Sequence, residues 1–457
     1  MFSSKKEKKL TIITLSCIIS LSALLHVYKI STPSSPVFDE SHFATYSADY
    51  VTGGSFFDIH PPLGKLIYAS VLTLFPKESL ADATFITMNR SSDGRKIDYI
   101  KNDRQFGTFP YVALRLTSAL FGLFLILTFY FFLQSIGLSN VSALLGAFFI
   151  SLDNALLLDT RLILLNGMYL FFGILALTFY FKKKPSVFWA GVFLGLSLSV
   201  KLTGIVFLLP MLIHSYFREK HSRKIWLVLA TVGPTILLAV SSSNFFLLSP
   251  SARFSLWQKI GLHLPQTHSA LSAFLLSLSM DFSFSFVGYL VGATYVYFQS
   301  SFYFWPIMYK PIVMTKQIVL EGNPVIWFSS TAAVLASAVL FFKKLPVKDK
   351  NILNILLGGY VSSMLIFLLI RRATFLYHYY PALLFAIALL AWLISYKLGL
   401  KNLEDLRRSQ IISLCAIVLL CLTGFYLMAP LTYGVDDFHL PTLKPLVNLV
   451  QSLANQQ

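Results

Sequence analysis

Charged residues are scarce in this sequence, and that scarcity indicates which solvent surrounds the chain. Only 12% of its 457 residues are Asp, Glu, Lys or Arg, whereas 56% are hydrophobic. A soluble protein usually carries about 25% charged residues, and the mean hydropathy here is +0.69. The chain has too few charges to cover a water-facing surface. We therefore predict an integral membrane protein.

Further absences exclude other classes of protein. The three cysteines, Cys17, Cys415 and Cys421, lie in apolar runs and offer neither a disulfide framework nor metal-ligand spacing. No Gly-rich phosphate loop of the Walker type occurs. The net charge of +17 arises from basic residues that fall in short clusters between apolar runs. That pattern is typical of membrane topology, so we expect no nucleic-acid partner.

Eleven apolar runs are long enough, or nearly long enough, to cross a bilayer as helices. A spanning helix needs about 20 mostly apolar residues, and these runs are too long for the strands of a membrane barrel. We predict an all-α polytopic membrane protein with about 11 transmembrane helices. The predicted spans are residues 10–29, 111–133, 140–158, 163–181, 186–200, 204–217, 225–248, 324–342, 351–370, 381–397 and 411–430.

The basic residues predict the orientation of these helices. The run Leu10 to Leu25 follows a basic start without a small-residue cleavage site, so we expect a retained first helix. If successive spans cross the membrane in alternating directions, every Lys- or Arg-rich connection falls on the same side as the N-terminus. The positive-inside rule makes that side cytoplasmic. These connections are residues 5–9, 182–184, 218–224, 343–350 and 397–408.

The outer side receives two long segments, residues 30–110 and 249–323. Each contains an apolar stretch, at residues 63–75 and 271–297, that we expect to lie along the interface as an amphipathic helix. We find no internal repeat and no soluble domain. The prediction is one domain over residues 1–457, embedded in a plasma membrane.

The first outer loop carries the densest group of polar residues. Asp39 and Glu40 are adjacent, so they point in different directions and suit two roles rather than one shared proton; a solvated acidic pair is the alternative. His60 precedes two prolines that suit the start of the interfacial helix, and Lys65 follows within it.

Cationic residues also occur inside, or at the outer ends of, the apolar runs. Each costs about 2.5–3.5 kcal/mol at a helix centre, so such residues usually face a partner or an aqueous cavity. Snorkelling to the interface is the alternative for each alone. The predicted topology gathers them on the side that holds Asp39 and Glu40. They are Arg115, Arg161, Lys201, Arg371 and Arg372, the last two preceding His378.

Carboxylates beside Arg and Lys at the outer face suit a lipid phosphate that carries a sugar. The lipid tail stays in the bilayer while the phosphate meets the cations. A phosphate leaves readily and needs cations rather than a proton donor, whereas an acceptor hydroxyl needs a base. One carboxylate within reach would supply it, typically worth about 10²–10⁴-fold in rate.

The sequence resembles the protein O-mannosyltransferase family of GT-C type membrane glycosyltransferases. The matching segments follow the family's order over nearly the whole chain. They are residues 38–43, 57–65, 115–122, 152–154, 161–165, 195–204, 304–306, 322–327 and 377–381.

The resemblance implies an all-α GT-C fold, a polyprenyl- or dolichyl-phosphate mannose donor, protein Ser/Thr acceptors and inversion at the sugar carbon. It makes Asp39 the base and Glu40 a residue that positions the acceptor or the base. We expect no cofactor and no obligatory metal. The residues assigned to binding of the donor phosphate or the substrate are Arg115, Arg161, Lys201, Arg371, Arg372, His378, His60 and Lys65.

The sequence also departs from the family's pattern. Asn166 stands where an acidic residue often follows the Arg-Ile-Leu-Leu run, and Leu202 replaces the usual Trp after Lys201. The second outer loop is too short for the β-trefoil domain of eukaryotic members, which implies a compact prokaryotic form. A related transferase that modifies a lipid or glycan is the alternative enzyme. A transporter is disfavoured because the two halves show no matching broken helices.

Overall fold

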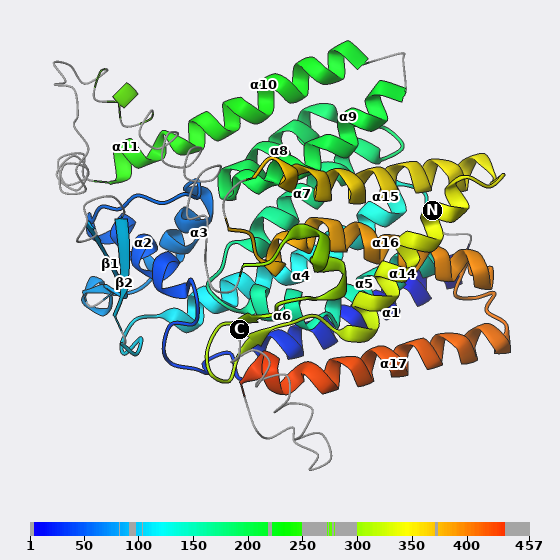
Figure 1. The fold of residues 1–457 in the computed structure, drawn as a ribbon, viewed down its shortest axis with the longest axis horizontal. Helices are drawn as coiled ribbons and strands as arrows, with labels where there is room; N and C mark the ends of the chain where they lie inside the picture. The colour runs from blue at the N-terminus through cyan, green and yellow to red at the C-terminus, as the bar shows by residue number, and fades with distance from the viewer. Residues whose placement is uncertain are drawn as a thin grey trace.

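The computed structural model describes residues 4–81, 83–90, 97–102, 104–217, 222–248, 299–370 and 373–434, with Ser272, residues 274–276 and Leu278. Within that part, seven helical segments are long and apolar enough to cross a membrane. Figure 1 shows the long helices lying side by side. They are α1 (Lys5–Val27), α4 (Tyr111–Ser135), α10 (Ser222–Ser241) with α11 (Ser243–Leu247), α14 (Pro324–Phe341), α15 (Val347–Leu365) with η4 (Ile366–Leu368), α16 (Tyr380–Leu398) preceded by η5 (Leu376–Tyr379), and α17 (Arg408–Tyr433).

The remaining predicted spans are shorter or broken helices. Helices α5 (Asn140–Ser151) and α6 (Asn154–Arg161) are long and apolar enough to cross a membrane only when taken together, and they are bent by 63° to one another. Three shorter apolar segments complete the set: α7 (Asn166–Phe181), α8 (Val187–Val200) and η2 (Leu202–Phe207) continued by α9 (Leu208–Phe217). The helical nature of the predicted runs is confirmed, whereas the number of eleven spans stays a prediction.

The bend between α5 and α6 has a local cause. Asp153 lies between the two helices and caps the start of α6, where its Oδ1 accepts a hydrogen bond from the amide of Leu156 at 3.0 Å. Its Oδ2 accepts from the amide of Asn323 at 3.3 Å, just before α14. A side chain that satisfies the open amides of a helix start fixes a new helix direction at that residue.

Smaller elements gather at one end of the helices, on the left of Figure 1. Helix α3 (Leu63–Leu72) begins directly after Pro62 and confirms the predicted helix, although it ends three residues early. The all-α prediction contained no strands, but two short antiparallel pairs occur. The elements at this end are α2 (Glu40–Thr52), η1 (Lys77–Leu80), and β1 (Ile86–Arg90) paired with β2 (Ile97–Lys101). Three further small elements precede α14 in the chain: η3 (Phe302–Ile307), and β3 (Ile312–Val313) paired with β4 (Val319–Leu320).

The core lies around α16, whose residues from Tyr380 to Trp392 are all buried. It packs against α14, α15 and α5. Close packing is also visible between α8 and α10, where a Cβ atom on Gly195 would come within 2.8 Å of the backbone oxygen of Gly233. By contrast, α1 and α17 expose large apolar side chains such as Leu24 and Leu419, as expected where lipid is the solvent.

Candidate active site

Asp39 and Glu40 stand at the start of α2 in opposite environments. Asp39 is the residue before the helix, its side chain makes no capping hydrogen bond, and about a third of it (34%) is exposed. Glu40 is completely buried. The preceding Phe38 has a positive φ of 54°, an unusual conformation for a bulky residue. At this start of α2 the side chain of Glu40 therefore lies in the interior, whereas that of Asp39 stays accessible.

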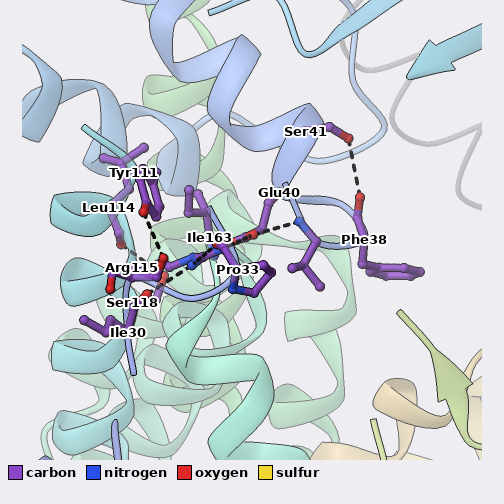
Figure 2. Close-up of polar contacts among 12 residues, drawn as sticks. Ile30, Pro33, Phe38, Glu40, Ser41, Tyr111, Leu114, Arg115, Ser118 and Ile163 are labelled. Carbon is purple, nitrogen blue, oxygen red and sulfur yellow. Dashed lines mark hydrogen bonds and ion pairs between the residues drawn. The ribbon is translucent and has the colours of Figure 1, made fainter. Parts of the chain in front are cut away.

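Glu40 forms a bidentate ion pair with Arg115 of α4, as Figure 2 shows. The Nε and Nη2 groups of Arg115 donate to Oε1 and Oε2 of Glu40 at 2.8 and 2.7 Å, and neither side chain is exposed. The same carboxylate accepts from the amides of Val37 at 2.8 Å and Ile163 at 2.9 Å. Paired and hydrogen-bonded in this way, a buried charge is held in one position.

Arg115 directs its remaining contacts at the protein. Its Nη1 donates to the carbonyls of Ile30 at 3.0 Å and Pro33 at 2.8 Å, in the segment after α1. The guanidinium also lies over the ring of Tyr111, 5.0 Å from its centroid. Four of its five N–H groups are thus engaged. Arg115 joins α4, the segment after α1 and the start of α2.

His42, one turn into α2, faces Asp39 with 3.8 Å between its Nδ1 and Oδ1 of the carboxylate. Burial lowers the pKa of His42 below its ordinary value, although Asp39 opposes that shift. Lys101 adds to the lowering, and Asp58 opposes it more weakly. Burial thus favours the neutral form of the imidazole at this contact.

Lys65 holds the loop that precedes α3. Its ammonium donates to Oδ2 of Asp58 at 2.6 Å and to the carbonyls of His60 and Pro61, and the side chain is buried. The ring of His60 packs against Phe43 of α2 with 6.0 Å between centroids. Lys65 and His60 border a small cavity that Leu202 and Asn244 also line.

Lys201 lies at the break between α8 and η2 and belongs to a buried polar chain. Its ammonium donates to Oδ1 of Asn166 at 2.9 Å, and Nδ2 of Asn166 donates to Oδ2 of Asp159 at 2.7 Å. The ammonium also lies 5.0 Å from the centroid of Tyr377. The Tyr377 ring in turn contacts Phe38, beside Asp39, at 6.3 Å. Lys201 therefore approaches the first outer loop.

Arg161 ends α6 and is buried. It donates to the carbonyl of Tyr28 and stacks on Tyr433, 4.5 Å from the ring centroid. Its Nε has no hydrogen-bond partner among the residues that the structure describes. Arg161 is close enough to Arg115 and Glu40 to interact with both electrostatically.

His378 is held within an aromatic group. Its Nδ1 accepts from the amide of Phe375 at 3.0 Å, and its ring stacks on Tyr377 with centroids 4.5 Å apart. Arg371 and Arg372, which precede it in the sequence, lie outside the described residues. The structure thus brings Glu40, Arg115 and Arg161 together and places Lys201 nearby.

Two family models together match most of the chain. One, described as dolichyl-phosphate-mannose-protein mannosyltransferase, matches residues 16–264. The other, described as the C-terminal four TMM region of protein-O-mannosyltransferase, matches residues 289–440. The chain belongs to the protein O-mannosyltransferase family. The resemblance that the sequence motifs indicated is confirmed.

Curated relatives of this family member align over part of their length. Dolichyl-phosphate-mannose–protein mannosyltransferase 1 of Saccharomyces cerevisiae is 30% identical over 211 residues, 44% of this chain and 23% of that protein. Protein O-mannosyltransferase 1 of Drosophila melanogaster is 31% identical over 189 residues, 39% of this chain and 20% of that protein. The alignments thus cover about a quarter or less of these relatives.

Solved structures share the GT-C fold of this mannosyltransferase family member. The Saccharomyces cerevisiae Pmt1–Pmt2 complex bound to the sugar donor matches with a TM-score of 0.72 at 16% identity, covering 95% of this chain and 91% of that one. The apo oligosaccharyltransferase of Archaeoglobus fulgidus matches with a TM-score of 0.56 at 13% identity, covering 94% and 57%. The predicted fold class is confirmed.

Two buried acidic residues of this family member were missed by the sequence reasoning. Asp159 is buried, and its Oδ2 accepts a hydrogen bond from Nδ2 of Asn166. Its position inside an apolar run, two residues before Arg161, was a usable signal. Glu321, between β4 and α14, has an enclosed Oε2 without a hydrogen-bond partner among the described residues. Burial raises the pKa of Glu321 from 4.5 to about 7.

Proposed function

We propose that this protein transfers mannose from a polyprenyl- or dolichyl-phosphate carrier to Ser or Thr hydroxyls of proteins. Family membership and the names of the curated relatives support the reaction. The observation that carries the proposal is that two adjacent carboxylates lie in opposite environments. Glu40 is buried in an ion pair, whereas Asp39 is partly exposed and makes no capping hydrogen bond.

Asp39 is the proposed general base. It takes the proton of the acceptor hydroxyl while the hydroxyl oxygen bonds to C1 of mannose. The bond from C1 to the phosphate oxygen breaks, and the lipid phosphate leaves with the electron pair. Attack from the face opposite the leaving group inverts the configuration at C1. A neutral His42 beside Asp39 suits this role, because an imidazolium there would lower the basicity of the carboxylate.

Arg115 and Glu40 are the proposed positioning pair. Since most N–H groups of Arg115 contact Glu40 and backbone carbonyls, we assign it to holding the start of α2 rather than to direct contact with the phosphate. Lys65 has a similar task in the next loop, where it binds Asp58 and two carbonyls. These contacts fix where Asp39 stands relative to the substrate.

Binding of the donor phosphate is assigned to Arg161 and Lys201. Both are buried cations at breaks between apolar helices, and Arg161 retains an Nε donor without a hydrogen-bond partner in the described residues. The chain from Lys201 through Asn166 to Asp159 orients the ammonium. Arg371, Arg372 and His378 remain candidates for the same substrate. The cations would stabilise the departing phosphate, so we expect no obligatory metal.

We place the reaction at the outer face of the plasma membrane. Lys- and Arg-rich connections lie on the predicted cytoplasmic side with the N-terminus, and the first outer loop lies opposite. Protein acceptors would therefore meet the site outside the cell.

The test is transfer of labelled mannose from polyprenyl-phosphate mannose to a Ser/Thr-rich peptide by purified protein. We expect Asp39→Asn to slow transfer by about 100-fold or more, because a general base contributes about 10²–10⁴-fold. Glu78→Gln is the matched control, since Glu78 is an exposed acid in η1 near the same end of the helices. Its rate should equal that of the wild type.

Wild-type turnover in Asp39→Asn would remove this residue from the chemistry. Label that reaches only a lipid or glycan would favour the related transferase over protein mannosylation.

A further inference from the structure

A second feature lies at the opposite end of the helices from Glu40 and Arg115. A cavity of about 1850 Å³ opens among the ends of α4, α7 and α14 and the starts of α8 and α15, with α9 and α10 as further walls. Arg115 and Ser135, which lines the cavity, belong to the same helix. At 1.5 Å per residue they stand about 30 Å apart along it. The cavity is therefore separate from the candidate active site.

The rim of this cavity is strongly basic. Lys182 and Lys183 line it from the connection between α7 and α8, and Lys348 and Lys350 line it from the start of α15. His214 of α9 also lines the cavity, and none of its lining residues within the described part of the chain is Asp or Glu. Four lysines from two connections thus line one space, and no acidic side chain lines it among the residues that the structure describes.

The rest of the wall is largely apolar. Ile213 and Val361 are substantially exposed, as is Phe342 at the end of α14. The cavity is larger than the roughly 300–1,000 Å³ of ordinary small-molecule sites. A basic rim above an apolar interior matches a molecule with an anionic head and long hydrocarbon chains.

We infer that this cavity binds an anionic glycerophospholipid of the leaflet that faces the basic connections, with its headgroup phosphate among Lys182, Lys183 and Lys348 and its acyl chains against the apolar wall. Basic pockets between membrane helices on the positive side are suited to such headgroups. The two lysine-bearing connections line the same cavity, so a headgroup bound to both would join the α7–α8 and α14–α15 helix pairs.

A bulk membrane lipid fits better than the lipid carrier of the reaction. The proposed transfer takes place near Asp39, about 30 Å away along α4. A carrier held at this end could not present its phosphate to Arg161 at the same time. The inference is thus independent of the mannose-transfer chemistry, and either proposal can fail without the other.

The experiment measures lipid binding to the purified full-length protein by native mass spectrometry. Phosphatidylglycerol, phosphatidylcholine and polyprenyl phosphate are titrated separately. We expect phosphatidylglycerol to bind more tightly than the other two. The variant Lys182→Gln/Lys183→Gln/Lys348→Gln should weaken phosphatidylglycerol binding by at least about tenfold. Lys350 is left in place because it binds the carbonyl of Phe341 and lies over its ring.

The matched control removes three charges outside the cavity lining, in Lys184→Gln/Lys343→Gln/Lys344→Gln. It should bind phosphatidylglycerol within about twofold of the wild type, since a mere surface potential would respond equally to both triple variants. A second variant, Val361→Trp, fills the apolar wall without changing charge and should lower binding of the same lipid. Equal binding of phosphatidylglycerol and phosphatidylcholine, equal loss in both triple variants, or preference for polyprenyl phosphate would each overturn the inference.

Discussion

At the residue scale, the buried pair of Glu40 and Arg115 is the strongest local constraint on the site. Removal of one partner from a buried ion pair costs about 3–5 kcal/mol, because a charge is left without compensation. We expect Arg115→Ala and Glu40→Ala each to lower the free energy of unfolding by about this amount in detergent. The double variant should lose much less than the sum, since no lone charge remains.

The measurement is a double-mutant cycle from denaturant or thermal unfolding. Additive losses would mean that the two side chains do not stabilise one another, and the positioning role would then lack its basis. Arg115→Lys is a useful intermediate, because a lysine keeps the charge but loses the two-pronged geometry.

Glu321 predicts a pH dependence of stability. Burial raises its pKa from 4.5 to about 7, so between these values the folded protein binds more protons than the unfolded chain. Stability should therefore fall as pH rises from about 4.5 to 7 and stay lower above that range. The contribution is about 1–2 kcal/mol, reduced because water reaches part of the side chain.

Glu321→Gln should remove this loss and be more stable than the wild type at pH 8. Melting temperatures from pH 5 to pH 8 test it, with the exposed Glu78→Gln as control. A parallel pH dependence in the wild type and Glu321→Gln would contradict the assignment.

At the element scale, the bend between α5 and α6 decides where Arg161 and Asp159 stand. Asp153 caps α6 and also accepts the amide of Asn323. Asp153→Ala should lower the free energy of unfolding by about 1–3 kcal/mol, because it removes a helix cap and leaves a buried amide without an acceptor. Asp153→Asn keeps an accepting oxygen and should cost less. If unfolding measurements give both variants the same stability, the cap does not maintain the bend.

The sequence predicted these elements unevenly. Apolar runs were enough to find the helices, because length and hydropathy determine a membrane span. The pairing of β1 with β2 was missed although both segments begin with an isoleucine, Ile86 and Ile97, since five-residue strands in a polar loop give a weak signal. The bend at Asp153 was also missed, because its partner Asn323 is 170 residues away in the chain.

At the scale of the whole molecule, the long helices separate two regions with different chemistry. Partly exposed Asp39 and the buried cations Arg161 and Lys201 lie at one end, and the lysine-rimmed cavity lies at the other. Asp39, Glu40 and the cations were identifiable from the sequence as unusual residues for their surroundings. Their separate roles were not, because the proposed positioning role of Arg115 rests on its contacts with Glu40, Ile30 and Pro33, which only the structure shows.

The central claim is that an outer-loop carboxylate and cations from distant helices act on one lipid-phosphate sugar. The most direct test is a cryo-electron microscopy structure of the protein with a non-transferable polyprenyl-phosphate mannose analogue. The account predicts phosphate oxygens within about 4 Å of Lys201 or Arg161, with C1 of the sugar on the side of Asp39. A phosphate bound away from both cations, with Asp39 remote from the sugar, would contradict it.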